Sequence, residues 1–103
     1  MTEQLKQAKR LIGRVDRVES KPGGAPEWGF IVTEDWTSYF WHIKDVEHKR
    51  IGQFDVVSFE PQPAKEGSSQ LKAVAIKVEK QKASPEFFGK FARFVRERNE
   101  EVA

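Results

Sequence analysis

Residues 27–44 of this 103-residue chain read Glu27-Trp28-Gly29-Phe30-Ile31-Val32-Thr33-Glu34-Asp35-Trp36-Thr37-Ser38-Tyr39-Phe40-Trp41-His42-Ile43-Lys44. This stretch holds all three tryptophans, the only tyrosine, two of the eight phenylalanines and one of the two histidines. β-Branched and aromatic residues favour strands, and the polar residues 34–37 separate two such runs, at 28–33 and 38–44. The stretch therefore predicts a β-hairpin with many aromatic side chains.

Alternation along the two predicted strands assigns each ring to a face of the sheet. Successive side chains of a strand point to opposite faces, so we expect Ile31, Trp41 and Ile43 to face the core together. The side chains expected on the outer face are then Trp28, Phe30, Phe40 and His42. Flat rings on an open sheet can stack against unpaired bases, which makes these residues candidates for nucleic-acid binding.

The remaining segments predict a small barrel. Residues 11–19, 53–61 and 71–79 form three further strand-like runs, separated by turn-rich segments that include the Pro/Gly loop at 20–26. We expect Val15 inside the barrel, and Val74, Ile76 and Val78 on the inner face of the last strand. Five short strands fit a closed five-stranded antiparallel barrel of the oligonucleotide-binding (OB) type better than a sandwich, which uses about seven.

After the predicted barrel the apolar period changes from two to 3.6. Ser84-Pro85-Glu86 is a helix start: a capping hydroxyl, a proline suited to the first turn and an acid near the positive end of the helix dipole. An amphipathic C-terminal helix follows. We expect a polar arm at residues 1–10, the barrel at 11–80, and a linker with the helix at 81–103.

The phenylalanines of this helix have two interpretations. An apolar stripe usually packs on its own domain, and here it either covers the aromatic hairpin or lies elsewhere on the barrel. Alternatively, the helix presents its rings to a protein partner or to a second copy of the chain. The residues concerned are Phe87, Phe88, Phe91 and Phe94.

Composition and charge exclude several classes of protein. The chain has 38% hydrophobic, 33% charged and 12% aromatic residues, which is typical of a folded domain and not of a disordered one. No apolar run reaches the roughly 18 residues of a membrane span, and a secretory leader is not evident. The absence of cysteine excludes disulfides and favours a cytoplasmic location. We expect no membrane association.

The net charge of +2 is unevenly distributed. Residues 1–17 carry five basic and two acidic groups, residues 18–76 six and nine, and residues 77–103 seven and five. The predicted barrel is therefore mildly acidic, and its flanks are basic. Because phosphate neutralisation supplies much of nucleic-acid affinity, we expect any such binding to be modest or to depend on the flanks.

Several motifs within residues 12–79 resemble those of the cold-shock domain, an OB-type barrel that binds single-stranded RNA and DNA. Gly13-Arg14-Val15 resembles the family's Gly-Lys-Val, Trp28-Gly29-Phe30-Ile31 its Phe-Gly-Phe-Ile, and Phe40-Trp41-His42-Ile43 its Phe-Val-His-Phe. Residues 52–59 are similar to the Gly-x-x-Val-x-Phe segment, and residues 73–78 to the final Ala-x-Asn-Val. The resemblance implies that Trp28, Phe30, Phe40 and His42 stack on bases.

The chain departs from the family pattern on the first strand. Where the family has Lys-Trp-Phe, this sequence has Asp16-Arg17-Val18, so two rings are missing and one charge is reversed. Arg17 can still stack its guanidinium on a base, and Arg14 stands where the family has a lysine. We therefore add Arg14 and Arg17 to the candidate binding residues. Glu27 also replaces a glycine of the family pattern.

The leading functional hypothesis is a non-catalytic protein that binds single-stranded nucleic acid, RNA in preference to DNA. The alternative is a protein-interaction module that acts through the C-terminal helix and has lost nucleic-acid binding. Catalysis is not expected, since His42 and His48 are the only ready bases and neither has the spacing of a metal site. No cofactor or metal is expected either.

Overall fold

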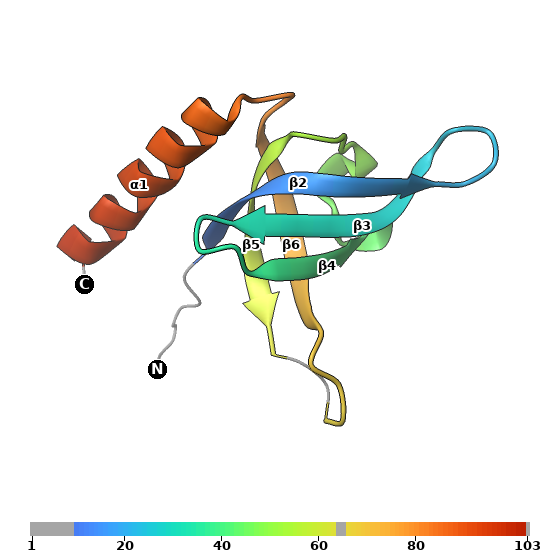
Figure 1. Cartoon of the computed structure of the whole chain (residues 1–103), viewed down its shortest axis with the longest axis horizontal. Helices are drawn as coiled ribbons and strands as arrows, with labels where there is room; N and C mark the ends of the chain where they lie inside the picture. The colour runs from blue at the N-terminus through green and yellow to red at the C-terminus, as the bar shows by residue number, and fades with distance from the viewer. Residues whose placement is uncertain (1–9, 64–65, 103) are drawn as a thin grey trace.

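Five strands close into a barrel that is followed by a helix (Figure 1). The computed structural model describes residues 10–63 and 66–102, so the arm expected at 1–10 lies outside the described residues apart from Arg10. The strands are β2 (Leu11–Ser20), β3 (Pro26–Thr33), β4 (Ser38–His42), β5 (Val56–Gln62) and β6 (Leu71–Lys80). Two 3-10 turns, η1 (Ile43–Asp45) and η2 (Glu47–Lys49), follow β4, and helix α1 spans Pro85–Val102. The predicted barrel with a C-terminal helix is confirmed.

The strand order around the barrel is β2-β3-β4-β6-β5, and β5 pairs back with β2. Four of the five pairings are antiparallel, whereas β4 and β6 run parallel, with Tyr39 opposite Leu71. The antiparallel arrangement expected from the sequence is therefore wrong for this pair. The reason is geometric: directions cannot alternate all the way around a closed ring with an odd number of strands.

The core fills the interior of the barrel. Val15, Ile31 and Trp41 are fully buried, as the alternation predicts, and Phe59 joins them from β5. Ile43 is half-buried and packs against the same cluster, but it does so from η1, because β4 ends at His42.

The inner face of β6 differs from the expected one. Ala73 and Ile76 are fully buried, whereas Val74 is only half-buried. Ala75 lies between them with φ of 51°, at an irregularity in the pairing of β6 with β5. Such a bulge adds one residue and shifts the alternation. The face therefore changes parity within the strand, which a strict period of two does not predict.

Helix α1 begins as the sequence predicts. The backbone N–H of Phe87 donates to the Ser84 hydroxyl at 3.1 Å, and Pro85 is the first helical residue. The helix packs against the barrel through a second apolar cluster. This cluster comprises Ile12, Val56, Ala83 and Ala92, with Phe88, Phe91 and Val95 partly buried against it. Figure 1 shows α1 at one side of the barrel.

β3 passes close to its neighbours in the barrel at Gly29, in the middle of the strand. A Cβ atom there would lie 1.8 Å from the carbonyl oxygen of Arg17 and 2.9 Å from Nε1 of Trp41. Neither neighbour can move away, because one is backbone of the adjacent strand and the other belongs to a fully buried ring. Only glycine fits this position.

We expect Gly29→Ala to lower the free energy of unfolding by about 3 kcal/mol, the upper range of overpacking. Urea denaturation followed by tryptophan fluorescence measures this. Gly52→Ala is the matched control, since its added Cβ would meet only the Asp55 carboxylate at an ordinary 3.8 Å. Equal stability of the two variants would contradict the close contact at Gly29.

Candidate nucleic-acid interface

Three rings form a cluster on the outer face of β3 and β4: Trp28, Phe30 and Phe40, hereafter the aromatic cluster. Their centroids lie 6.0 Å (Trp28 to Phe30), 5.9 Å (Trp28 to Phe40) and 6.0 Å (Phe30 to Phe40) apart. Phe30 and Phe40 are direct cross-strand partners. All three side chains are half-buried, so each ring packs on its neighbours and still reaches solvent. The sequence predicted this grouping and its direction.

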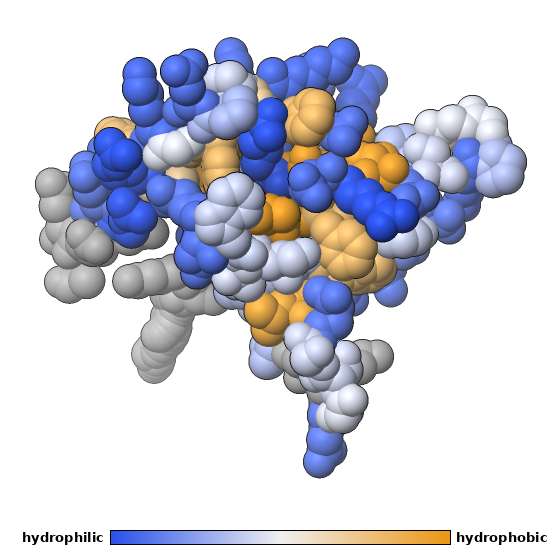
Figure 2. Space-filling view, in the orientation of Figure 1, coloured by the Kyte–Doolittle hydropathy of each residue, from blue (hydrophilic) through white to orange (hydrophobic). Residues whose placement is uncertain are grey.

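Figure 2 shows how the surface around these strands is composed. Hydrophobic residues gather in the middle of the face, over β3 and β4, and hydrophilic residues surround them. Because α1 packs on Ile12 and Val56, it does not cover the aromatic cluster. Of the two placements expected for the helix on its own domain, the structure therefore has the one that leaves the aromatic cluster uncovered.

His42 borders the aromatic cluster as the cross-strand partner of Trp28. Its Nδ1 accepts a hydrogen bond from the backbone N–H of Lys44 at 3.1 Å, which caps the turn η1. A neutral imidazole that accepts at Nδ1 carries its proton on Nε2. That donor has no hydrogen-bond partner among the described residues, so it is available to a ligand.

Arg17 lies beside the same cluster. Its guanidinium carbon is 5.9 Å from the centroid of Trp28, within the range of a cation–π contact. The Nε atom also forms an ion pair with Glu19 at 2.5 Å. Arg17 is thus brought to the rings as predicted, but part of its charge is already balanced.

Arg14 has a different position from the one expected. Its guanidinium carbon lies 4.5 Å from the centroid of Phe54, and its Nε donates to the carbonyl of Ala83 at 2.9 Å. These contacts join β2 to the segment that precedes β5 and to the segment that precedes α1. Arg14 is opposite Val32 in the pairing of β2 and β3, beyond the end of the aromatic cluster. The structure therefore does not bring it to the three rings.

The turn between β3 and β4, residues 34–37, is built around Asp35. The Thr33 hydroxyl donates to its carboxylate at 2.5 Å, and the backbone N–H of Thr37 donates at 3.2 Å. The Thr33 and Thr37 hydrogen bonds hold the pKa of Asp35 below its ordinary value. The turn presents Trp36, whose side chain is 86% exposed.

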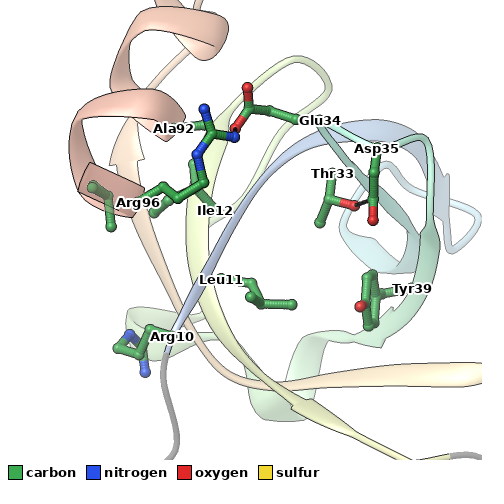
Figure 3. Close-up of a pocket in the computed structure, with 10 residues that line it drawn as sticks. Arg10, Leu11, Ile12, Thr33, Glu34, Asp35, Tyr39, Ala92 and Arg96 are labelled. Atoms are coloured by element: carbon green, nitrogen blue, oxygen red, sulfur yellow. Dashed lines mark hydrogen bonds and ion pairs between the residues drawn. The ribbon is translucent and has the colours of Figure 1, made fainter. Parts of the chain in front are cut away.

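Two cavities flank this turn. The first, of about 300 Å³, lies between the turn, the start of β2 and α1 (Figure 3). Figure 3 shows Arg96 of the helix reaching Glu34 of the turn, and the two side chains form an ion pair at 3.1 Å. The second, of about 400 Å³, is a groove between the turn and the first residues of α1. We call this second cavity the Trp36 groove, because Trp36 forms part of its wall together with Val32 and Phe88.

The four helix phenylalanines do not act as one surface. Phe88 and Phe91 pack toward the barrel, whereas Phe87 and Phe94 are 36% and 54% exposed. Phe87 stacks on Phe91 at 5.7 Å, and Arg98 lies over Phe94 at 5.4 Å. Packing on the chain's own domain is therefore confirmed for Phe88 and Phe91, whereas contact of Phe87 and Phe94 with a partner stays a prediction.

No metal-binding group and no membrane span is found in the described part of the chain. Within residues 10–63 and 66–102, no three His, Asp or Glu side chains are close enough to share a metal ion. The helical segments of the same residues lack the length and apolarity to cross a membrane. Comparison of the sequence with models of protein families and with curated proteins gives no match.

Sequence reasoning missed the Trp36 groove. It placed Trp36 in a polar connection and gave the ring no role. Two signals in the sequence point to it: a tryptophan within a four-residue turn, and a glycine, Gly89, inside an amphipathic helix. Neither signal predicts that the two residues line the same groove, because tertiary packing brings the turn and α1 together.

We expect Asp35→Asn to lower the melting temperature slightly at pH 7. The pKa of Asp35 is depressed in the folded state, so the carboxylate stabilises the fold above its unfolded-state pKa, and this contribution is lost as pH falls through the folded-state pKa. The difference between variant and wild type should therefore vanish in strong acid. Thermal unfolding over a pH series tests this, and a difference that is constant with pH would contradict it.

Proposed function

We propose that this protein binds single-stranded nucleic acid, RNA in preference to DNA, without catalysis. The observation that carries the proposal is the aromatic cluster: three mutually contacting, half-exposed rings on the outer face of a closed barrel. Every base has a π face, so a ring platform binds unpaired bases largely independently of sequence. Paired bases cannot reach such a platform, because they are already stacked within a duplex.

The groups around the cluster suit the backbone of the nucleic acid. Arg17 stands at its border and offers positive charge to phosphates. Nε2 of His42 offers a donor next to Trp28. A 2′-hydroxyl can accept such a hydrogen bond, and it is the group that distinguishes RNA from DNA. With Arg17 partly neutralised by Glu19, stacking supplies more of the affinity than charge does.

The test is the affinity of a labelled, mixed-sequence RNA of about eight nucleotides, measured by fluorescence anisotropy at low and physiological salt. We expect Trp28→Ala, Phe30→Ala and Phe40→Ala each to weaken binding by about 1–3 kcal/mol, the contribution of one base stack. Phe94→Ala is the control, because it removes a ring from α1 that is more exposed than those of the cluster. A DNA of the same sequence should bind less tightly, and that difference should shrink in His42→Ala.

Absence of binding by the wild type at low salt would refute the proposal. Equal losses in Phe94→Ala and the cluster variants would also refute it, since the effect would then not belong to the cluster. A steep dependence on salt with no effect of ring removal would indicate a purely electrostatic contact elsewhere on the molecule.

The second candidate function is protein interaction through α1. The observation that favours it is the exposure of Phe87 and Phe94 on α1. We expect the double variant Phe87→Ser/Phe94→Ser to remove self-association, if the wild type shows any, and to leave the barrel folded. Analytical ultracentrifugation over a concentration series measures this. A wild type that stays monomeric throughout would exclude self-association by this face.

A further inference from the structure

The Trp36 groove is lined by two residues that are unfavourable for their own local structure. Trp36 has φ of 67°, in the left-handed region, where glycine or asparagine is preferred and a bulky residue is an outlier. Its ring gains almost no burial in return, since it is 86% exposed. Packing within the chain therefore does not explain why a tryptophan occupies this turn.

Gly89 is the second such residue. It lies inside α1, where glycine is less stable than alanine by about 0.8–1.0 kcal/mol. Glycine is needed in a helix when something approaches closely, but no atom lies within 4 Å of the position where a Cβ of Gly89 would be. The missing side chain leaves space in the groove that the folded chain itself does not use.

The groove is continuous with the aromatic cluster. Val32, in its wall, is two residues beyond Phe30 on β3 and lies on the same face of the sheet. Same-face neighbours on a strand are two residues and about 6.5–7 Å apart, so the groove begins at the next position on this face beyond the last ring of the cluster. A chain of stacked or splayed bases that follows β3 thus reaches the groove directly.

Three charged residues line the groove: Arg14, Asp16 and Glu34. Arg14 already donates to the Ala83 carbonyl and lies over Phe54, and Glu34 is paired with Arg96, which leaves the exposed Asp16 carboxylate as the acceptor for a ligand. A carboxylate accepts hydrogen bonds from the exocyclic amino groups of bases, as in the contact with N4 of cytosine. The volume of about 400 Å³ falls in the range of small-molecule pockets.

We propose that the Trp36 groove is a base-binding slot at one end of the bound strand. An unpaired base that carries an amino group, adenine, cytosine or guanine, enters it, stacks on Trp36 and donates to Asp16. This inference rests on the proposed function, because the base belongs to the same nucleic-acid strand whose other bases stack on the aromatic cluster. The slot extends the binding site by one nucleotide.

Two variants test the slot without damaging the fold. Trp36→Gly removes the ring and suits the left-handed backbone, and Gly89→Leu fills the groove and suits the helix. We expect both proteins to unfold at or above the wild-type temperature. Gly89→Ala is the matched control, since it improves the helix but adds only one methyl group to the groove.

The measurement is the affinity for RNA oligomers of increasing length, about four to eight nucleotides. For the longest oligomers we expect both variants to bind about 5- to 150-fold more weakly than wild type, the equivalent of one lost base stack. The shortest oligomers, which the aromatic cluster alone accommodates, should bind all three proteins equally. Gly89→Ala should follow the wild type at every length.

Base identity provides the second readout. Uridine oligomers with a single terminal cytidine, placed at either end, are compared with all-uridine oligomers. We expect wild type to prefer cytidine at one end only, and Asp16→Ala to lose that preference. Equal binding of both terminal bases by the wild type would overturn the assignment of an amino-bearing base.

The outcomes separate the slot from the proposed function. If Trp28→Ala weakens binding while Trp36→Gly and Gly89→Leu bind every length as wild type does, RNA binding stands and the slot is refuted. If Trp36→Gly loses affinity equally at all lengths, Trp36 belongs to the main platform and the slot is again refuted. If wild type binds no oligomer, both proposals fail together.

Discussion

The close approach of β2 to β3 at Gly29 is the constraint on which the aromatic face depends. Because the carbonyl of Arg17 and the ring of Trp41 occupy the space where a side chain would be, position 29 must face inward and must be glycine. Alternation then forces both neighbours, Trp28 and Phe30, outward. The outward rings are thus a consequence of the close contact of Gly29 with β2 and Trp41, and not an independent surface feature.

The position of α1 decides whether that face is available. The helix packs Phe88 and Phe91 against Ile12, and its Arg96 forms an ion pair with Glu34 in the turn between β3 and β4. An exposed ion pair of this kind contributes little stability, so the apolar contacts hold the helix and the ion pair sets its alignment. A helix held on this side of the barrel adds a wall to the end of the aromatic face without covering it.

Local patterns in the sequence predicted the hairpin, the direction of its rings and the start of α1, because alternation and capping depend on a few neighbouring residues. Features that depend on closure of the whole barrel could not be predicted from such local patterns. The parallel pairing of β4 with β6 follows from closing five strands, and the buried position of Ala73 follows from the bulge at Ala75. Arg14 is held by Phe54 and Ala83, which only tertiary structure brings to it.

The same distinction bears on the candidate site. The aromatic cluster could be predicted because it lies within one hairpin, whereas the groove joins residues 36 and 89, whose proximity no local pattern encodes. Trp36 and Gly89 each contradict the preference of their own backbone, and natural chains tend to break local rules where function requires it. A destabilising choice at one position has many explanations. Trp36 and Gly89, however, form the walls of one groove at the end of the aromatic cluster. One requirement explains both residues: the groove must stay wide and keep an exposed ring at its edge.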